Sequence, residues 1–297
     1  MSDLMHKLNV CRIFLPLRGY PAELSAATIA LLSAEACGGS IHIFNVQKAV
    51  DQRQYNFSVI RDLILFHAEK MKLETEVEIV EGFSAREQIQ KKLEKERFDL
   101  IITGTQRGQG FPYDFRVSNA LNLANSPNRD CPLFVVQSKD PDFSTHTLYD
   151  RNISKILFPV VSADETDDLV ARVAKLLKNS LSATMAELLA VKIVEVSSFT
   201  PPSFIRREKA FYNTVSGDFL EEMDRYKTML DPIKLRILVG HKFNRAISYL
   251  AKKEKVDLLL LGVRPPYTAS LRRRPIWKIA RAARSDVVYI FPPKKVA

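Results

Sequence analysis

Apolar and polar positions follow the same succession in each half of the chain: a short apolar strand containing a proline, a helix, a second strand and a longer helix. Alternation of extended apolar runs with apolar residues at helical spacing indicates a strand–helix repeat. The predicted elements are strand 12–16, helix 22–36, strand 40–46 and helix 57–72, then strand 155–159, helix 166–178, strand 187–196 and helix 204–229.

The repeat is clearest further along each half, where matching residues recur at an offset of 158. Gly82, Asp99 and Gly104 correspond in this way to Gly240, Asp257 and Gly262. The segments DLIITG and DLLLLG are nearly continuous apolar runs, typical of central strands of a parallel sheet covered by helices on both faces. A capping box at Ser84-Ala-Arg-Glu87 predicts a helix start, and last strands are expected at 132–137 and 287–291.

This order predicts an α/β protein with two tandem open doubly wound sheets, each of about five parallel strands with helices on both faces. The length of 297 residues agrees with two domains. We expect domain 1 over residues 1–140, a polar linker over 141–152 and domain 2 over 153–297.

Composition narrows the class of protein without identifying it. The apolar runs are too short for a membrane span, the three cysteines form no CxxC pair, and no signal-peptide pattern opens the chain. We therefore expect a cytoplasmic protein with no membrane span, and peripheral docking on a membrane protein stays open as an alternative. The net charge of +10 lies in residues 141–297, while residues 1–140 are neutral overall, which indicates an anionic partner or ligand.

Several of these segments together resemble the universal stress protein family over nearly the whole chain, once per half. The resemblance is carried by the strands ending in Pro16 and Pro159, by the segments 99–104 and 257–262, and by CPLFVV at 131–136. It implies a five-stranded parallel sheet of the adenine-nucleotide alpha-hydrolase type in each domain. It also implies that the two domains pair about a pseudo-twofold axis within one chain, and that the protein takes part in the stress response.

Some family members hold ATP at the carboxyl ends of the central strands, and the resemblance implies the residues to inspect. An acid is expected two residues after each strand proline, but Arg18 and Val161 stand there. In the second half, Pro265 and Pro266 remove backbone donors from the loop that would cradle phosphates. Both nucleotide sites are therefore predicted to be degenerate.

Two interpretations of the first-half loop remain open. The loop is an ordinary surface turn, or it is a residual phosphate site for ATP or AMP in domain 1, because its glycines would let backbone N–H groups approach an anion. The candidate nucleotide-binding residues are Gly104, Thr105, Arg107, Gly108, Gly110 and Ser118.

The carboxyl-terminal part of the chain is strongly basic. Either its cations form a solvated face, or they bind an anionic partner protein, a phosphate-bearing ligand or an anionic membrane surface. Specific nucleic-acid binding is not expected, because no recognition motif accompanies the charge. The candidate anion or partner patch comprises Arg264, Arg272, Arg273, Arg274, Lys278 and Arg281.

No pattern for catalysis or metal binding accompanies the fold signals. The chain has no GxSxG, P-loop or HExxH motif, and the acidic pair Asp167–Asp168 is interpreted as solvated surface. We therefore predict a non-catalytic stress-response regulator that binds a protein partner or self-associates through its paired domains. The alternatives are a slow ATPase that uses the first-half loop and a soluble regulatory partner of a membrane transporter.

Overall fold

In the part of the chain that the computed structural model describes, there are fifteen helices and strands. The described residues are 12–20, 23–47, 54–82, 84–105, 123–126, 129–138, 153–161, 164–180, 186–195, 217, 221, 224, 226–228, 230–240, 242–264, 279 and 285–294. The elements of the first half are β1 (Arg12–Leu17), α2 (Glu23–Cys37), β2 (Ser40–Gln47), α3 (Gln54–Lys70), β3 (Glu74–Glu81), α4 (Ala85–Lys95), β4 (Leu100–Thr105) and β5 (Leu133–Gln137). Those of the second half are β6 (Lys155–Val160), α7 (Glu165–Ser180), β7 (Glu187–Glu195), β8 (Ile233–Gly240), α10 (Phe243–Lys253), β9 (Leu258–Gly262) and β10 (Asp286–Phe291).

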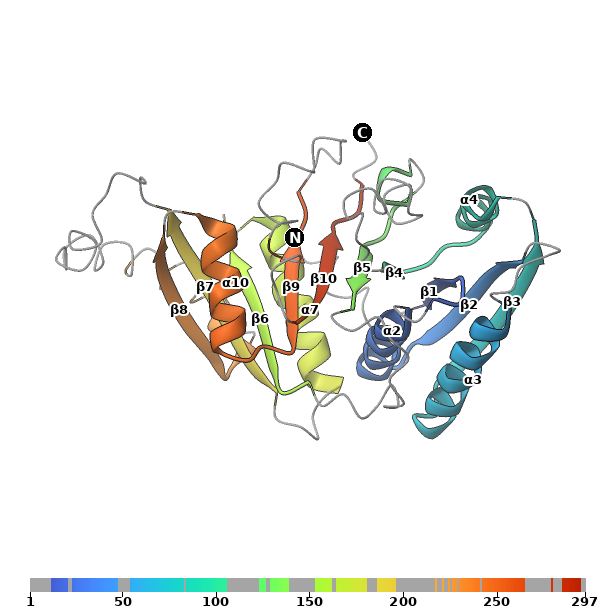
Figure 1. Cartoon of the computed structure of the whole chain (residues 1–297), viewed down its shortest axis with the longest axis horizontal. Helices are drawn as coiled ribbons and strands as arrows, with labels where there is room; N and C mark the ends of the chain where they lie inside the picture. Colours follow the sequence, from blue (N-terminus) through green and yellow to red (C-terminus); the bar gives the residue numbers. More distant parts are fainter. Residues whose placement is uncertain are drawn as a thin grey trace.

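The strands form one sheet in the order β3-β2-β1-β4-β5-β10-β9-β6-β7-β8. Within each half all pairings are parallel, and the second half repeats the order of the first in the reverse direction along the sheet (Figure 1). The predicted pair of five-stranded parallel sheets is confirmed. The two sheets are joined edge to edge rather than separate, which differs from the expectation of two independent sheets.

The seam between the halves is the antiparallel pair β5 and β10. Val135 pairs with Tyr289 there. The two residues are equivalent, because each directly precedes the residue that pairs with a repeated glycine. That residue is Val136, paired with Gly104, in the first half and Ile290, paired with Gly262, in the second. A pseudo-twofold axis therefore passes through this pair. Joining the halves satisfies the backbone groups of two apolar edge strands that would otherwise be exposed.

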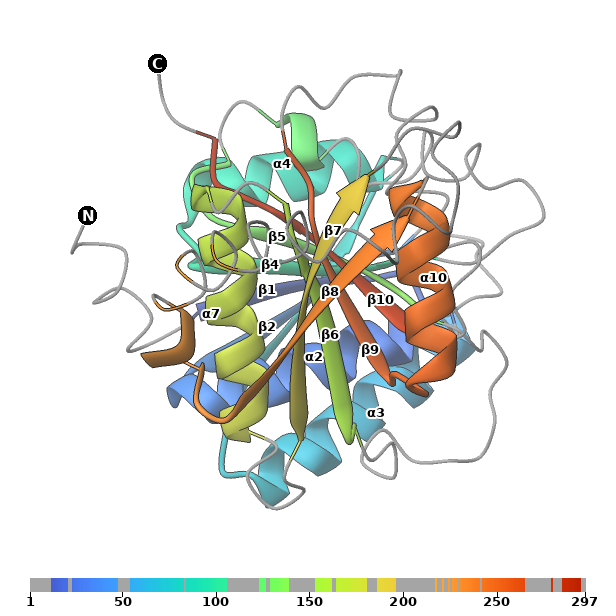
Figure 2. The same cartoon turned by 90° about the vertical axis from the view of Figure 1, so that its left-hand side faces the viewer.

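Helices cover both faces of the sheet. Helices α2 and α7 lie against each other on one face, where α3 also packs, and their side chains share a core cluster with β1, β2 and β6. Residues of α4 and α10 pack into a second cluster on the opposite face. Seen along the row of strands, the sheet shows a large accumulated twist (Figure 2).

The repeated aspartates, Asp99 and Asp257, bind the backbone at the start of a strand in each half. The Asp99 carboxylate accepts the backbone N–H of Arg12 at 2.9 Å, and that of Asp257 accepts those of Ser154 and Lys155 at 2.9 and 3.1 Å. Each aspartate therefore fixes the start of the first strand of its half beside the fourth. The predicted cap is also confirmed, since the Ser84 hydroxyl accepts the N–H of Glu87 and α4 begins directly after Ser84, at Ala85.

Other sequence predictions fall partly outside the described residues. Of the helix expected over 204–229, residues 217, 221, 224 and 226–228 are described and helical. The linker at 141–152 lies outside the described residues, so the domain boundaries stay a prediction. None of the helices described has the length and apolar character to cross a membrane.

Candidate functional site

In open parallel sheets, ligands bind outside the carboxyl ends of the strands. Strands β1, β2, β4 and β5 run parallel, so their carboxyl ends lie together at one end of the strands. The strands of the second half are antiparallel to these across the seam, so their carboxyl ends point the opposite way. The chain thus has two candidate sites, one per half.

A buried glutamate closes the end of β1. The Glu23 carboxylate accepts the backbone N–H groups of Arg18, Gly19 and Tyr20 at 2.8 to 3.0 Å. Gly19 has a positive φ of 90°, which turns three successive N–H groups toward one point. Glu23 is only 4% exposed. The acid that the resemblance places two residues beyond Pro16 is absent, but a carboxylate from α2 accepts the N–H of the residue found there.

Burial and hydrogen bonding shift the pKa of Glu23 in opposite directions. Burial raises its pKa from the ordinary 4.5 to about 7, although the backbone N–H groups of Arg18, Tyr20 and Gly19 favour the ionised form. A carboxylate in these surroundings can gain or lose a proton near neutral pH.

Two buried polar side chains lie at the carboxyl ends of β2 and β5, which are separated in the sheet by β1 and β4. The Asn45 amide at the end of β2 donates to the Leu17 carbonyl at 2.8 Å, and the Gln137 side-chain oxygen at the end of β5 accepts from the Tyr289 hydroxyl at 3.2 Å. Among the described residues, the Asn45 Oδ1 and Gln137 Nε2 atoms have no hydrogen-bond partner. Leaving such groups unsatisfied is costly, so they are available to a ligand or to water.

The predicted nucleotide-binding residues are only partly described. Gly104 and Thr105 end β4 and pair with Val136 and Gln137, and Thr105 is buried. The predicted residues that lie outside the described part of the chain are Arg107, Gly108, Gly110 and Ser118. The candidate phosphate loop therefore stays a prediction.

An ion-pair cluster occupies the corresponding strand ends in the second half. Arg264, two residues beyond β9, contacts Asp164 through Nε at 2.6 Å and through a terminal nitrogen at 3.0 Å. The same terminal nitrogen contacts Asp167 at 2.8 Å. The second oxygen of Asp167 accepts the backbone N–H of Val161 at 2.9 Å. Each of the two carboxylates therefore contacts the guanidinium and also accepts a nearby backbone N–H group.

Asp164 also organises the start of α7. One of its oxygens accepts the backbone N–H groups of Thr166 and Asp167 at 3.0 and 3.1 Å, as an N-cap residue does. Burial opposes ionisation of Asp164, but hydrogen bonds from Arg264 and from the N–H of Asp167 outweigh it and lower its pKa. Asp164 therefore stays ionised at neutral pH.

The interpretation of Asp167 and Asp168 as solvated surface is wrong. Asp167 is only 3% exposed and is paired with Arg264, and the Asp168 carboxylate accepts from the Tyr226 hydroxyl at 2.7 Å. The two adjacent carboxylates do point in different directions, as expected, but each finds an internal partner. Sequence spacing alone gave no sign that a cation two residues after β9 would reach α7.

Gly262 has a packing role in addition to its place in the repeat. A Cβ atom at this position would lie 2.7 Å from the Thr166 Cγ2 atom and 3.1 Å from a methyl of Val170. Both neighbours lie in the first turns of α7, so the glycine lets this helix approach the end of β9. Gly262, the counterpart of Gly104 in the first half, is thus packed against a helix.

Arg264 is the one described residue of the predicted basic patch, and its guanidinium is neutralised by two carboxylates. The other five residues of that patch, Arg272, Arg273, Arg274, Lys278 and Arg281, lie outside the described residues. Their role as an anion or partner patch stays a prediction.

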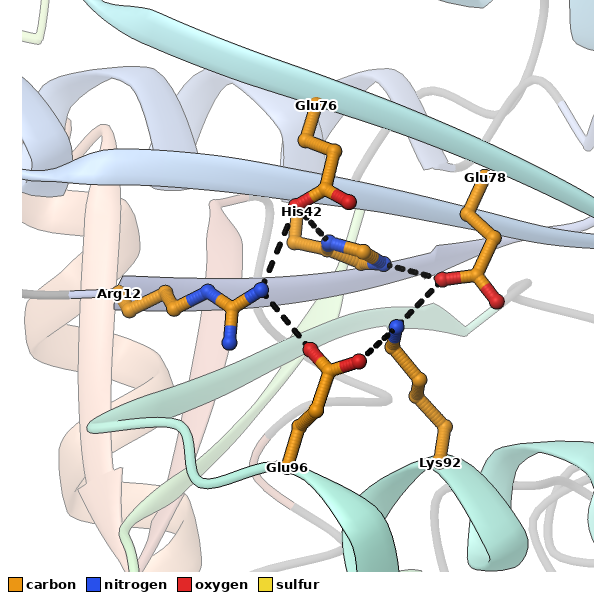
Figure 3. A network of polar contacts seen from close by, with 6 residues as sticks. All are labelled: Arg12, His42, Glu76, Glu78, Lys92 and Glu96. Atoms are coloured by element: carbon orange, nitrogen blue, oxygen red, sulfur yellow. Dashed lines mark hydrogen bonds and ion pairs between the residues drawn. The ribbon is translucent and has the colours of Figure 1, made fainter.

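A further polar cluster, here called the His42 network, lies between β2, β3 and α4 (Figure 3). His42 is 1% exposed beside the rings of Phe14, Phe44 and Phe98. Its Nδ1 lies 2.8 Å from Glu76, and its Nε2 lies 3.0 Å from Glu78. Ionised carboxylates only accept hydrogen bonds, so both contacts are hydrogen bonds when both ring nitrogens carry protons.

Two further cations and a third carboxylate complete this network. Arg12 contacts Glu76 and Glu96 at 3.3 and 2.8 Å, and Lys92 contacts Glu78 and Glu96, each at 2.5 Å. The hydrogen bond from His42 is the main cause that lowers the pKa of Glu76, and the bond from Lys92 is the main cause for Glu96. With His42 protonated, three cations balance three carboxylates.

The His42 network also has the residue types of a metal site. Ligand atoms of His42, Glu76 and Glu78 lie within 4.8 Å of one another. However, the two ring nitrogens face different carboxylates, and Lys92 and Arg12 already neutralise these carboxylates. We therefore interpret the cluster as an ion-pair network that fixes α4 and the edge strand β3 to the sheet.

No family model and no curated protein matches this sequence. Solved structures do match over the whole chain. A functionally unknown protein from Pseudomonas aeruginosa has 16% identity and a TM-score of 0.61, with 98% of this chain and 95% of that one covered. A universal stress protein from Archaeoglobus fulgidus has 12% identity and a TM-score of 0.57, with 96% of this chain and 97% of that one covered.

The sheet order and the matched structures define an open α/β protein built from two related halves with parallel sheets. More specifically, the chain has the universal stress protein fold, present twice in tandem. At these identities the comparison establishes the fold and confirms the resemblance at that level.

Proposed function

We propose that this protein is a non-catalytic binding and regulatory protein of the stress response, in which the second half no longer holds a nucleotide. The observation that carries the proposal is the ion-pair cluster of Arg264, Asp164 and Asp167. A phosphate at this strand end would meet two carboxylates and would have to compete with them for Arg264. Like charges at such short range disfavour binding.

Packing supports the same proposal. Because Gly262 is needed for the close approach of α7 to β9, the backbone there is already in contact with a helix. A cradle for phosphate requires N–H groups that point into open space. In the second half the N–H of Val263 instead donates to the Ile290 carbonyl at 2.8 Å.

The test is calorimetric titration of the full chain with ATP, ADP, AMP and cyclic AMP, with and without Mg²⁺. We expect at most one nucleotide per chain and no turnover of ATP. Two nucleotides per chain, or hydrolysis above the rate of a Gly108→Val variant, would contradict the proposal. Gly108 lies in the first-half loop, so this variant removes the one candidate site while leaving the second-half cluster intact.

A second candidate function, nucleotide binding in the first half, is favoured by Asn45 and Gln137. The buried Asn45 Oδ1 atom provides an acceptor at the end of β2, where Asn45 pairs with Leu17 of β1, and the buried Gln137 Nε2 atom provides a donor at the end of β5, where Gln137 pairs with Thr105 of β4. Bound ATP or AMP would satisfy such groups, with Arg107 supplying charge to a phosphate.

Thermal denaturation separates the two candidates. If the first half binds AMP or ATP, the nucleotide should raise the melting temperature of the wild type in a concentration-dependent way. Asn45→Leu and Gly108→Val should each remove the shift, whereas Lys252→Met, on exposed α10, should leave it unchanged. A shift that survives both first-half variants would place the ligand elsewhere.

A further inference from the structure

The two outer strands of the ten-stranded sheet carry opposite charges. Strand β3 has the sequence ETEVEIVE and forms one end of the sheet, and β8 has the sequence IKLRILVG and forms the other. The register of each strand with its neighbour makes Thr75 equivalent to Ile233, so Glu76 corresponds to Lys234 and Glu78 to Arg236. The halves thus differ by a full charge reversal at two equivalent edge positions.

These charges lie on the same face of the sheet. Val77, Leu235 and Ile233 pack against the core cluster of α2 and α7. Side chains alternate along a strand, so Glu76, Glu78, Lys234 and Arg236 point to the face covered by α4 and α10. The side chains of Glu76 and Lys234 are 60% and 63% exposed. The contacts of Glu76 and Glu78 within the His42 network fall on their Oε2 atoms.

Edge strands commonly carry charge of one sign, which discourages pairing with another chain. Here two copies of the same edge would bring like charges together, whereas β3 facing β8 would bring opposite charges together. Within the chain, Glu76 and Glu78 also contact the cations of the His42 network, and Lys234 contacts Glu187 at 3.0 Å. Because the halves are antiparallel across the seam, β3 and β8 run in opposite directions. A second copy that continues the twisted sheet, shifted and rotated relative to the first, would therefore bring its β3 antiparallel to β8 of the first copy, with equivalent faces on the same side.

We propose that β3 of one copy pairs with β8 of another in a head-to-tail contact. One antiparallel register brings Glu76 opposite Arg236 and Glu78 opposite Lys234, two opposite-charge pairs on one face. The same register brings Val77 opposite Leu235 and Ile79 opposite Ile233, two apolar pairs on the other face. Opposite-charge and apolar cross-strand pairs both stabilise a sheet.

The exposure of Ile79 agrees with such a contact. Ile79 is a large apolar side chain in an edge strand and is 44% exposed in the single chain. Pairing with Ile233 of the second copy would cover it. A head-to-tail contact uses two different surfaces, so it does not close on itself and extends into a chain of copies.

The first test is sedimentation velocity of the full-length protein over a range of concentrations, at low and at high ionic strength. We expect the average mass to rise with concentration at low ionic strength and to fall toward the monomer at high ionic strength. The double variant Lys234→Glu, Arg236→Glu should stay monomeric. The matched control Lys252→Glu, Lys253→Glu reverses two exposed charges on α10 and should associate like the wild type.

The second test fixes the register. An Ile79→Cys chain mixed with an Ile233→Cys chain should form an intermolecular disulfide under oxidation, since directly opposite residues lie within reach. A Val80→Cys chain mixed with the same partner should cross-link at least ten times less, because position 80 points to the other face. The wild type, which keeps Cys11, Cys37 and Cys131, reports background cross-linking.

A wild type that is monomeric at every concentration would overturn the proposal. So would association that the β8 double variant leaves unchanged, or equal cross-linking at positions 79 and 80. Far-UV circular dichroism of each variant confirms that it is folded.

Discussion

In both halves a carboxylate accepts backbone N–H groups just after the first strand, but the charges around the two carboxylates differ. In the first half the Glu23 carboxylate accepts three backbone N–H groups after β1, and in the second half Asp167 accepts the N–H of Val161 after β6. Both carboxylates are almost fully buried. Asp167, however, contacts the guanidinium of Arg264, whereas the bonds to Glu23 come from neutral backbone groups.

The two strand ends also differ in how their carboxyl groups ionise. Burial raises the pKa of Glu23 to about 7, although the backbone donors and the charge of Arg18 oppose it. In the second half, bonds from Arg264 help to keep the pKa of the partly exposed Asp164 below its ordinary value. The first strand end should therefore respond to pH near neutrality through Glu23, whereas the contact between Asp164 and Arg264 should persist there. The predictions below test this comparison, from the largest effect to the smallest.

The largest effect is expected at Glu23. Its folded-state pKa is raised above the ordinary value, so its contribution to stability is fully present below pH 4.5 and is lost as pH rises toward 7. Over that range the wild type should lose up to about 3 kcal/mol of unfolding free energy from this group. Glu23→Gln keeps an acceptor oxygen but cannot ionise, so it should lack this part of the pH dependence.

Urea denaturation of both proteins at several pH values measures the effect. Glu69→Gln, on an exposed position of α3, is the control for loss of one glutamate. If Glu23→Gln and the wild type lose stability in parallel as pH rises, Glu23 is ionised throughout and its raised pKa is wrong.

The next effect is expected from Arg264→Met. Removing the guanidinium leaves the buried Asp167 charge without its cation, which should cost about 2 kcal/mol at neutral pH. The difference from the wild type should shrink as the pH falls toward the ordinary pKa of an aspartate, because Arg264 is one of the groups that lower the pKa of Asp164. Lys252→Met removes an exposed cation and should change stability by less than about 0.5 kcal/mol.

Gly262→Ala should cost about 1 to 3 kcal/mol, because its Cβ would crowd the Thr166 methyl and force α7 away from β9. Adding Thr166→Ser removes that methyl and should recover part of the loss. Chemical denaturation of the single and double variants measures the recovery. Equal stability of the single and double variants would show that α7 adjusts without cost.

The smallest effect concerns the starts of two equivalent helices. Ser84 caps α4 through its hydroxyl, whereas its counterpart Lys242 begins α10 with no side-chain cap bond. Ser84→Ala should cost about 1 kcal/mol, and Lys242→Ser should gain about half as much. Thermal denaturation measures both changes, and a loss of stability in Lys242→Ser would mean that Lys242 has another role.

The strand–helix order could be predicted from sequence because local patterns carry it. The runs at 99–104 and 257–262, and the cap at Ser84, need no knowledge of the rest of the chain. Joining of the two sheets through β5 and β10 was not predicted, because the family resemblance implied only that the two domains pair about a pseudo-twofold axis. Apolar strands look the same whether their neighbour in the sheet lies in the same half or in the other.

The candidate sites could not be predicted in the same way, because they depend on distant contacts. Arg264 meets Asp164 across 100 residues, and His42 meets Glu76 across 34. The sequence pattern indicated the place of each site, because Arg18 and Val161 stand where an acid was expected. The contacts found there are made by the backbone N–H groups of these two residues, which the Glu23 and Asp167 carboxylates accept.

The β5–β10 seam also affects how the molecule unfolds. Hydrogen bonds cross it from several elements, among them Ser25 to Asp286 at 3.0 Å and the buried Arg129 to the Phe291 carbonyl at 3.4 Å. Losing either half would strip the other of its neighbour and leave a bare apolar edge prone to aggregation. The two repeats are therefore expected to melt in a single cooperative transition, and neither should persist as a stable fragment by itself.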